Sequence, residues 1–520
     1  MKDEADGPSA GGGSLTARRS RLSRFILHPS SFILLLALPF LLDLAMSRGL
    51  SHDEHQHIAA GMLWAREGLL PYRDYPHFHT PYLAFAYGEM FRWTSHPLLV
   101  ARAFSVACAA GIVALVGGIA LAECQRKGAA LGAVALCLVS AVFTHTTGRA
   151  WNQEPALLLV LLAFVAQLRG LRERAFAWLA AGGLLLGLAI GFRITHAPLI
   201  APFGLATLLW AGERRLAAAT AFSAGLLAGL AGVFALCLAA PEGFLFGNFE
   251  FAKVNITYRF ATGEPRTMTL AKKLRFLWKE VLRPEAGLVA AALVPWIAAA
   301  WHARRAGKKL RIELRFLLLL LPFVLMGALA PSPVFEQYFY PLAPFLVLAG
   351  VFALAALPAG SRAARGSWLA GAAGLALAAG LHARVYKDLP ELFTVRKWAP
   401  MKIHERAQVL REHVSGGRIL TLAPIHPIEA GLAIDPSFAT GPFAWRIAPY
   451  VDPAKAARLR IVTAATLAAR LDAAPPAGIL LGYEEHGEEP LAEYAREHSY
   501  KRVPLEDGGE LWTRPSSNAQ

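Results

Sequence analysis

Two adjacent acids, Asp53 and Glu54, stand where an early apolar run gives way to a polar stretch. A carboxylate at such a boundary can take the proton of an acceptor hydroxyl held against a lipid surface, which is the task of a general base. Glu54 has a second explanation, because Ser51 and Glu54 form the S-x-x-E pattern of a capping box. Asp53 would also favour a helix start through its charge. We predict that Asp53 is catalytic, and both capping and substrate binding stay open for Glu54.

The polar stretch runs on to Trp93 and contains groups that bind sugars or phosphates. Arg73 can form a forked contact with phosphate, and His57 and His79 add ring nitrogens. Asp74 could either bind substrate or pair with its neighbour Arg73. An apolar chain rarely spends so many residues on one early connection without a use for it. We therefore take all four as candidate substrate-binding residues.

Two short helices are expected to position these groups. Apolar residues recur at helical spacing over His55–Gly68, which predicts an amphipathic helix that lies along the membrane surface and ends at its glycine. A second helix is expected to run to Trp93, with Thr80 as its cap and Pro81 in its first turn. The irregular backbone between the two helices would carry the arginine and the aromatic side chains.

Further cations stand near the predicted outer ends of apolar runs. Arg149 and Arg193 lie in two short connections, where a charge at the bilayer edge usually needs a partner or a purpose. Arg193 could instead extend its side chain to the interface. The segment Pro241–Pro284 is also basic. It is either an amphipathic surface helix on anionic lipid or a mobile loop that closes over a lipid phosphate, with Lys253 and Arg259 nearest to it.

The chain as a whole is more apolar than a soluble protein. Of its 520 residues, 55% are hydrophobic and 17% are charged, against about 25% charged in soluble globular proteins. Apolar runs of about bilayer length recur through the first three quarters. We predict a mainly α-helical, polytopic transmembrane bundle of about eleven spans, with juxtamembrane helices outside. The runs are Phe25–Met46, Pro97–Ala122, Gly128–His145, Pro155–Leu168, Ala175–Ala189, Ala197–Trp210, Leu216–Ala240, Ala286–Trp301, Phe316–Ala330, Tyr340–Leu357 and Trp368–His382.

Basic residues orient this bundle. With the N-terminus inside, every predicted inner connection carries arginine or lysine, and the short outer connections carry only Arg149 and Arg193. Topology thus explains the net charge of +15, and we expect no nucleic-acid partner. The four cysteines lie in or at the ends of apolar runs, so they form neither a disulfide framework nor a CxxC metal pair. The larger regions 51–96 and 241–284 then fall on the extracytoplasmic side of the membrane.

Composition divides the chain into three parts. Residues 1–24 are expected to form a disordered cytoplasmic tail, and 25–383 the membrane part. Residues 384–520 become charged and proline-punctuated, which indicates a small extracytoplasmic α/β domain. Apolar patches such as Arg418–Leu422 and Gly478–Leu481 predict short buried strands, and the last stretch reads strand, helix, strand, strand. Its sequence contains no glycine-rich phosphate loop, catalytic triad or metal cluster.

Several motifs of the membrane part resemble one known family. After the first apolar run come Asp-Glu, a helix with a glycine, then G-x-x-P-Y-x-D-Y and H-x-P, and the stretch from Gln337 reads Q-Y-x-x-P-x-x-P. This pattern resembles the C-type polytopic membrane glycosyltransferases. Within them it is similar to the branch with protein O-mannosyltransferases and the lipid A aminoarabinose transferase. The resemblance covers about Leu38 to Leu357, and the motif of Ser51–Pro81 is its most specific part.

The resemblance implies a reaction and roles for residues. Members transfer a sugar from a polyprenyl phosphate on the outer face, usually with inversion, to a lipid, glycan or protein acceptor. The acid after the first span is their catalytic or acceptor-positioning carboxylate, here Asp53. A second acid in the next outer connection, where members often have aspartate, corresponds to Glu154, which we expect to assist catalysis or to bind the acceptor. Gln337 and Tyr338 are expected to face the same cavity as these two acids.

Alternatives remain for the function and for a metal. Acids and histidines of the polar stretch could bind a divalent cation, but no fixed ligand spacing is present, and the family branch generally works without one; we expect no cofactor. A transporter or flippase of lipid-linked saccharides would also have many spans, although the span centres almost lack ionisable residues. A non-catalytic scaffold is a third possibility. We predict an integral protein of the bacterial plasma membrane.

Overall fold

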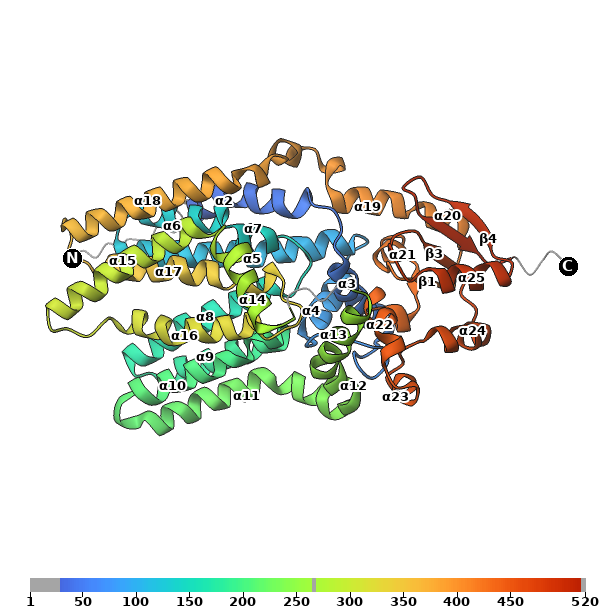
Figure 1. Ribbon diagram of the computed structural model, residues 1–520, viewed down its shortest axis with the longest axis horizontal. Helices are drawn as coiled ribbons and strands as arrows, with labels where there is room; N and C mark the ends of the chain where they lie inside the picture. Colours follow the sequence, from blue (N-terminus) through green and yellow to red (C-terminus); the bar gives the residue numbers. More distant parts are fainter. Residues whose placement is uncertain (1–28, 264–267, 516–520) are drawn as a thin grey trace, which may run out of the picture.

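The computed structural model describes residues 29–263 and 268–515. The predicted tail, residues 1–24, lies outside the described residues. The long helices run roughly along the long axis of the molecule, and a small sheet stands at one end of them (Figure 1). The helices labelled α3, α4, α13 and α22 lie between the bundle and the sheet. This junction is where the residues with candidate chemistry meet.

Within the described ranges, seven helical segments are long and apolar enough to cross a membrane. They are Pro97–Cys124 (α5), Gln153–Glu173 (α8), Gly212–Ala239 (α11 and the turn before it), Ala286–Arg305 (α15), Ile312–Leu329 (α16), Glu336–Ala355 (η5 and α17) and Arg362–Tyr386 (α18 and the turn after it). Four shorter apolar helices are Leu34–Met46 in α2 (Pro29–Met46), Lys127–Val139 (α6), Phe176–Phe192 (α9) and Ile194–Trp210 (η1 and α10). Each predicted run thus corresponds to a helix, except that Gly128–His145 is divided at Ser140 into α6 and α7 (Ala141–Thr146), and the first residues of Phe25–Met46 lie outside the described ranges. The count of eleven spans stays a prediction.

The predicted surface helix is α3, His52–Glu67, and Gly68 ends it in the left-handed conformation. Its bounds agree with the prediction, but its environment does not. Residues 54–63 are all buried, because the bundle packs against one side and the sheet region covers the other. A helix so enclosed does not lie on a membrane surface. Its polar side chains serve contacts between two parts of the protein.

The second short helix, α4, is Tyr82–Phe91. Pro81 is its N-cap residue, and the hydroxyl of Thr80 is buried without a hydrogen-bond partner, so the predicted threonine cap is wrong. Trp93 is exposed, as an interface residue would be. Phe91, however, is buried against Tyr87, where the two rings stack.

The basic segment before α15 is a set of short helices. It contains α12 (Pro241–Leu245), η3 (Phe246–Glu250), α13 (Phe251–Ala261), α14 (Leu270–Phe276) and η4 (Leu277–Leu282). The helix α13 contacts α22, which belongs to the C-terminal region. The segment therefore packs against the C-terminal region.

We call residues 418–513 the sheet unit. Its five strands are β1 (Arg418–Thr421), β2 (Ala433–Ile434), β3 (Gly478–Leu481), β4 (Lys501–Pro504) and β5 (Glu510–Thr513), in the order β2-β1-β3-β5-β4. The first three are parallel and the last two join antiparallel. The predicted order of strand, helix, strand, strand is confirmed by β3, α25 (Glu489–Glu497), β4 and β5. The other helices of the unit are α21 (Ile425–Glu429), α22 (Pro442–Ile447), α23 (Pro453–Arg458) and α24 (Ala464–Ala473), and α19 (Ala399–Ala407) and α20 (Val409–His413) precede it.

Candidate active site

The start of α3 is fixed by Glu54. Its carboxylate accepts hydrogen bonds from the backbone amides of Ser51 at 2.9 Å and Ala150 at 2.8 Å. Arg102, on α5, donates through Nε and Nη2 to the two carboxylate oxygens, each at 2.8 Å. Burial alone would raise the pKa of Glu54, but the charge and hydrogen bonds of Arg102 hold it below its usual value. Both partners are fully buried, so capping describes Glu54 and substrate binding does not.

We did not predict a role for Arg102 from the sequence, although its position indicates one. It lies inside the predicted span Pro97–Ala122, where an arginine needs a partner. Besides Glu54, it donates to the backbone carbonyls of Ala45, Arg48 and Gly49 at 2.7–3.0 Å. Every donor of its guanidinium is therefore used. Arg102 joins the end of α2, the start of α3 and α5 into one rigid corner.

Asp53 leaves the same helical turn in another direction. It is half-buried, and within the described part of the chain its carboxylate makes no hydrogen bond and no ion pair. Burial raises the pKa of Asp53 above its usual 3.8, against the opposing charges of Arg446, Arg193, His52 and Arg149 in decreasing order. An uncommitted carboxylate with a raised pKa, beside several cations, is typical of a functional group.

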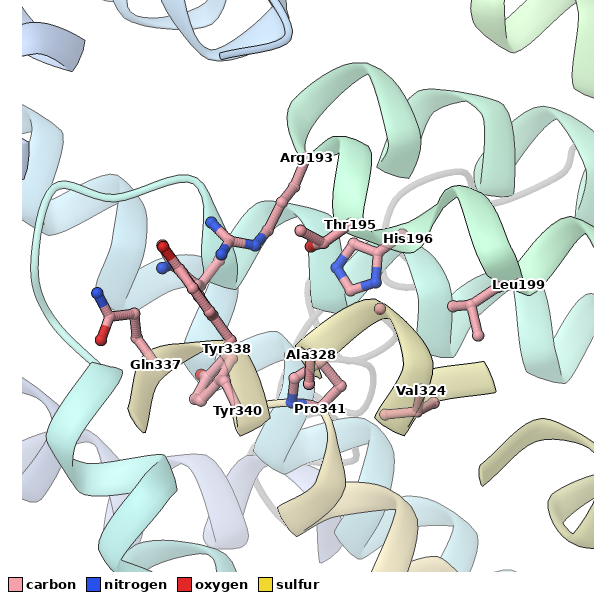
Figure 2. Close-up of a pocket in the computed structure, with 12 residues that line it drawn as sticks. Arg193, Thr195, His196, Leu199, Val324, Ala328, Gln337, Tyr338, Tyr340 and Pro341 are labelled. Atoms are coloured by element: carbon pink, nitrogen blue, oxygen red, sulfur yellow. The ribbon is translucent and has the colours of Figure 1, made fainter. Parts of the chain in front are cut away.

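Arg193 approaches Asp53 from the junction of α9 and η1. Its Nη1 donates to Oδ1 of Asn152 at 2.6 Å, and its guanidinium carbon lies 5.1 Å from the ring centre of Tyr338. In Figure 2, Arg193 and Tyr338 extend toward one another from two separate segments, with Gln337 beside them. Because the amide of Asn152 is neutral, the positive charge of Arg193 is oriented but not neutralised.

Gln337 and Tyr338, on η5 (Glu336–Phe339), line one small pocket together with Arg193 and Gln153 (Figure 2). The pocket has a volume of about 10 Å³, which is room for about one water molecule. A sugar would need this space to open. Arg193, Gln337 and Tyr338, all three predicted to bind substrate, thus line one pocket, and their role stays a prediction.

Arg149 lies on the loop between α7 (Ala141–Thr146) and α8. Its guanidinium carbon is 5.0 Å from the ring centre of Trp151, and its Nε is buried without a hydrogen-bond partner. The charge of Arg149 acts on Asp53 from the bundle side. It is thus a second cation that no carboxylate of the described chain pairs with.

A further cation, Arg446, acts on Asp53 from the sheet unit. Arg446, on α22 of the sheet unit, is the cation that acts most strongly on Asp53. The charge of Arg259, on α13, acts on both Tyr338 and Arg446. Nothing in the sequence pointed to Arg446, because its neighbours form no motif and its region lacked recognisable chemistry.

Three histidines lie behind this charged surface. The rings of His57 and His79 are 4.8 Å apart, and His77 is 6.4 Å from His79. Burial, aided by the neighbouring rings and by Arg193, lowers the pKa of His57 well below its usual value and that of His79 to about 3. Both are neutral imidazoles next to Arg193, and neutral rings can accept or donate hydrogen bonds without adding charge.

Glu154 occupies a different position from the one we expected. It is fully buried, and its Oε1 accepts a hydrogen bond from the backbone amide of Gly148 at 3.0 Å. Its Oε2 is buried without a partner. Gly148, at φ 88°, packs against the backbone of Ala45. These contacts place Glu154 under the loop that carries Arg149, and its charge acts on both Arg149 and Arg193. Its role in catalysis stays a prediction.

Three predicted substrate-binding residues lie elsewhere. Arg73 pairs with Asp74 at 2.8 Å, and Asp74 also accepts a hydrogen bond from the amide of Leu70 at 2.8 Å. The alternative of mutual pairing therefore describes them. Lys253 is exposed on α13, on another side of the helix than Asn255, which contacts Arg446. None of the three contacts the surroundings of Asp53.

The residues around Asp53 also bear on whether a metal ion could bind there. No cluster of three or more histidine, cysteine, aspartate or glutamate side chains that could hold an ion occurs in residues 29–263 and 268–515. Around Asp53, the neighbours are cations, which repel a metal ion. The residues present fit an anionic ligand better than a divalent cation.

Comparison with known proteins identifies the fold. Neither a protein-family model nor a curated protein matches the chain. The crystal structure of ArnT from Cupriavidus metallidurans bound to undecaprenyl phosphate matches with a TM-score of 0.56 and 13% identity, over 98% of this chain and 100% of that one. The apo crystal structure of the same protein matches with a TM-score of 0.57 and 13% identity, over 97% and 99%. The chain has the ArnT fold, which confirms at the level of fold the resemblance seen in its sequence motifs.

Proposed function

We propose that the protein is a membrane glycosyltransferase that moves a sugar from a polyprenyl-phosphate donor to a hydroxyl acceptor on the extracytoplasmic face. One observation carries this proposal. Asp53 is uncommitted and accessible, and the arginines 149, 193 and 446 around it make no ion pair within the described part of the chain. A carboxylate ready to accept a proton, next to unneutralised guanidinium groups, fits a sugar phosphate and its acceptor.

The reaction would proceed as a displacement at the anomeric carbon. The acceptor oxygen forms a bond to this carbon, and the bond from the carbon to the phosphate oxygen breaks. The hydroxyl proton passes to Asp53, and the electron pair of the broken bond leaves on the polyprenyl phosphate. Arg149 and Arg193 would stabilise the negative charge that gathers on this leaving group. Arg193 is already oriented by Asn152 and Tyr338, so little reorganisation accompanies the reaction.

The fold supports the class of donor. ArnT was crystallised with undecaprenyl phosphate, and it belongs to the branch that the sequence motifs resemble. We therefore propose an undecaprenyl-phosphate-linked hexosyl or pentosyl donor, a lipid, glycan or protein acceptor, and a place in the bacterial plasma membrane. The basic connections that end α5, α8, α10, α15 and α17 would face the cytoplasm, and the sheet unit would lie outside.

Transfer by purified protein tests the proposal. Wild-type protein, Asp53→Asn and Asp472→Asn would be compared with radiolabelled undecaprenyl-phosphate sugars and an envelope extract as acceptor. Loss of the base is expected to lower kcat by about 10²- to 10⁴-fold, with binding of undecaprenyl phosphate retained. Asp472 pairs with His498 on the sheet unit, so its variant should transfer like wild type. Undiminished transfer by Asp53→Asn would end the catalytic assignment, and vesicle translocation without transfer would favour the flippase alternative.

A further inference from the structure

The sheet unit is attached to the same helix that carries Asp53. His52 meets Glu484 at 2.9 Å, directly beside the candidate base. One turn further, the backbone amide of Ile425 donates to Nδ1 of His55 at 3.3 Å. At the other end of α3, Arg66 donates to the carbonyls of Gly431 and Leu432, and Glu67 pairs with Arg418 at 2.5 Å. The unit is therefore held along the whole length of α3.

Gly441 allows α22 to come close to this helix. Its backbone has φ 59° and ψ −134°, a conformation that residues with a side chain rarely adopt. A Cβ atom there would lie 2.8 Å from the carbonyl oxygen of Leu422 and 3.6 Å from Cβ of His55. The residue after Gly441 begins α22. The backbone conformation of Gly441 thus directs α22, which carries Arg446, toward the start of α3.

Arg446 is held between the sheet unit and the segment before α15. Its Nη2 donates to Oδ1 of Asn255 at 3.2 Å. Its guanidinium carbon lies 4.4 Å from the ring centre of Phe443 and 5.4 Å from that of Tyr258. Its Nε is buried without a hydrogen-bond partner. Neutral groups orient the guanidinium. Its Nε has no acceptor within the described residues and could donate a hydrogen bond to a bound ligand.

Two arginines from different parts of the molecule thus act on Asp53. Arg193 comes from the bundle, and Arg446 comes from the sheet unit. Both are oriented by an amide oxygen and an aromatic ring, and neither has a carboxylate partner in the described chain. Two oriented guanidinium groups that act on one carboxylate, and that have no ion pair of their own in the described residues, are suited to bind a phosphate.

We propose that the sheet unit is part of the active site, and that Arg446 binds the phosphate of the lipid-linked donor together with Arg193. This inference rests on the proposed function, because it takes the donor from it. It makes the sheet unit a wall of the reaction chamber, and not only a domain that covers the bundle. It also makes donor binding depend on the docking of the unit on α3.

Binding and kinetics of three arginine variants test this inference. Arg446→Gln should raise the Kd for undecaprenyl phosphate in nanodiscs, and the KM for the donor, by about 10- to 100-fold, because a hydrogen bond to a charged group is lost. Arg446→Lys keeps the charge without the fork and should recover part of the loss. Arg470→Gln is the matched control, because Arg470 pairs with Asp435 at 2.7 Å on the same unit. It should bind and transfer like wild type.

A pH profile separates phosphate binding from a merely structural role. Arg446 lowers the pKa of Asp53, so its removal should move the acid limb of kcat/KM to higher pH. Asn255→Ala, which removes the anchor of Arg446, should cause the same changes to a smaller extent. An unchanged Kd for undecaprenyl phosphate in Arg446→Gln would by itself overturn the inference. Because Kd is measured without a sugar, the inference is decided even if wild-type protein transfers none, which would count against the proposed function alone.

Discussion

Two charged clusters occupy opposite ends of the bundle, and they are built differently. At the end away from the sheet unit, two arginines meet two glutamates between α5, α8 and α16. Arg311 lies 2.6 Å from Glu123 and 3.2 Å from Glu313. Arg172 pairs with Glu313 and lies 3.5 Å from Glu123. Each charge there has a partner of opposite sign.

Around Asp53, arginines outnumber acids in the part of the chain that the structure describes. Arg149, Arg193 and Arg446 surround Asp53 without an ion pair in the part of the chain that the structure describes. The adjacent Glu54 is fully matched by Arg102. Excess charge at a partly buried position costs free energy unless a ligand neutralises it. A cluster with equal positive and negative charge is therefore interpreted as one that holds helices together. A cluster with an excess of arginine is interpreted as a binding place for an anion.

The largest loss of stability should follow from breaking the ion pair of Glu54 and Arg102. Arg102→Gln leaves Glu54 buried and unpaired, which is expected to lower the free energy of unfolding by about 3–5 kcal/mol. Thermal denaturation in detergent would measure it. The double variant Glu54→Gln/Arg102→Gln should lose less than the sum of the single variants, because no unpaired charge remains. Additive losses would show that the two side chains act independently.

Removing an arginine from the cluster around Asp53 should lower donor affinity without lowering stability. Arg193→Gln is expected to leave stability unchanged or raise it, because it removes a buried cation that makes no ion pair in the described part of the chain. Affinity for undecaprenyl phosphate should fall by about 10- to 100-fold, the effect of losing a charged hydrogen bond. Calorimetric titration and thermal denaturation of the same sample would test both parts. A variant as unstable as Arg102→Gln would mean that Arg193 is structural.

The burial of Asp53 should make the free energy of unfolding depend on pH. A pKa raised by burial gives a contribution to stability that is complete below the usual value of 3.8 and is lost as the pH rises through the raised value. Asp53→Asn should thus be more stable than wild type at neutral pH, by about 1.4 kcal/mol for each pH unit between the two pKa values. The gain should fade on acidification. Denaturation curves at several pH values measure it, and a gain independent of pH would contradict the burial of an ionised Asp53.

The sequence predicted the bundle better than the junction. Spans follow from apolar length and basic connections from charge, which are local properties, so α5 or α8 could be read directly. The capping box of Glu54 is equally local. Arg102 left a usable signal, as an arginine inside an apolar run. Its partner, however, lies 48 residues earlier in the chain, and no local pattern names it.

The candidate site could be predicted only in part, because the sheet unit forms one side of it. The motifs pointed to Asp53, Arg193 and Tyr338, which lie close together. They did not distinguish Arg73, whose residue type fits the chemistry and whose contacts do not. Arg446 is brought to Asp53 by the docking of α22 across almost 400 residues of chain, which depends on contacts such as Gly441 against α3. Such contacts have no periodic or compositional signature.

The smallest effect is expected at the balanced cluster away from the sheet unit. Arg172 is 44% exposed, and an exposed ion pair contributes about 0–1 kcal/mol. Arg172→Gln should therefore lower the free energy of unfolding by no more than this, and the difference from wild type should shrink in about 1 M salt, where charges are screened beyond about 3 Å. Donor affinity should be unchanged, in contrast to Arg193→Gln. A loss of donor affinity in Arg172→Gln would show that charge balance does not separate structural clusters from binding ones in this fold.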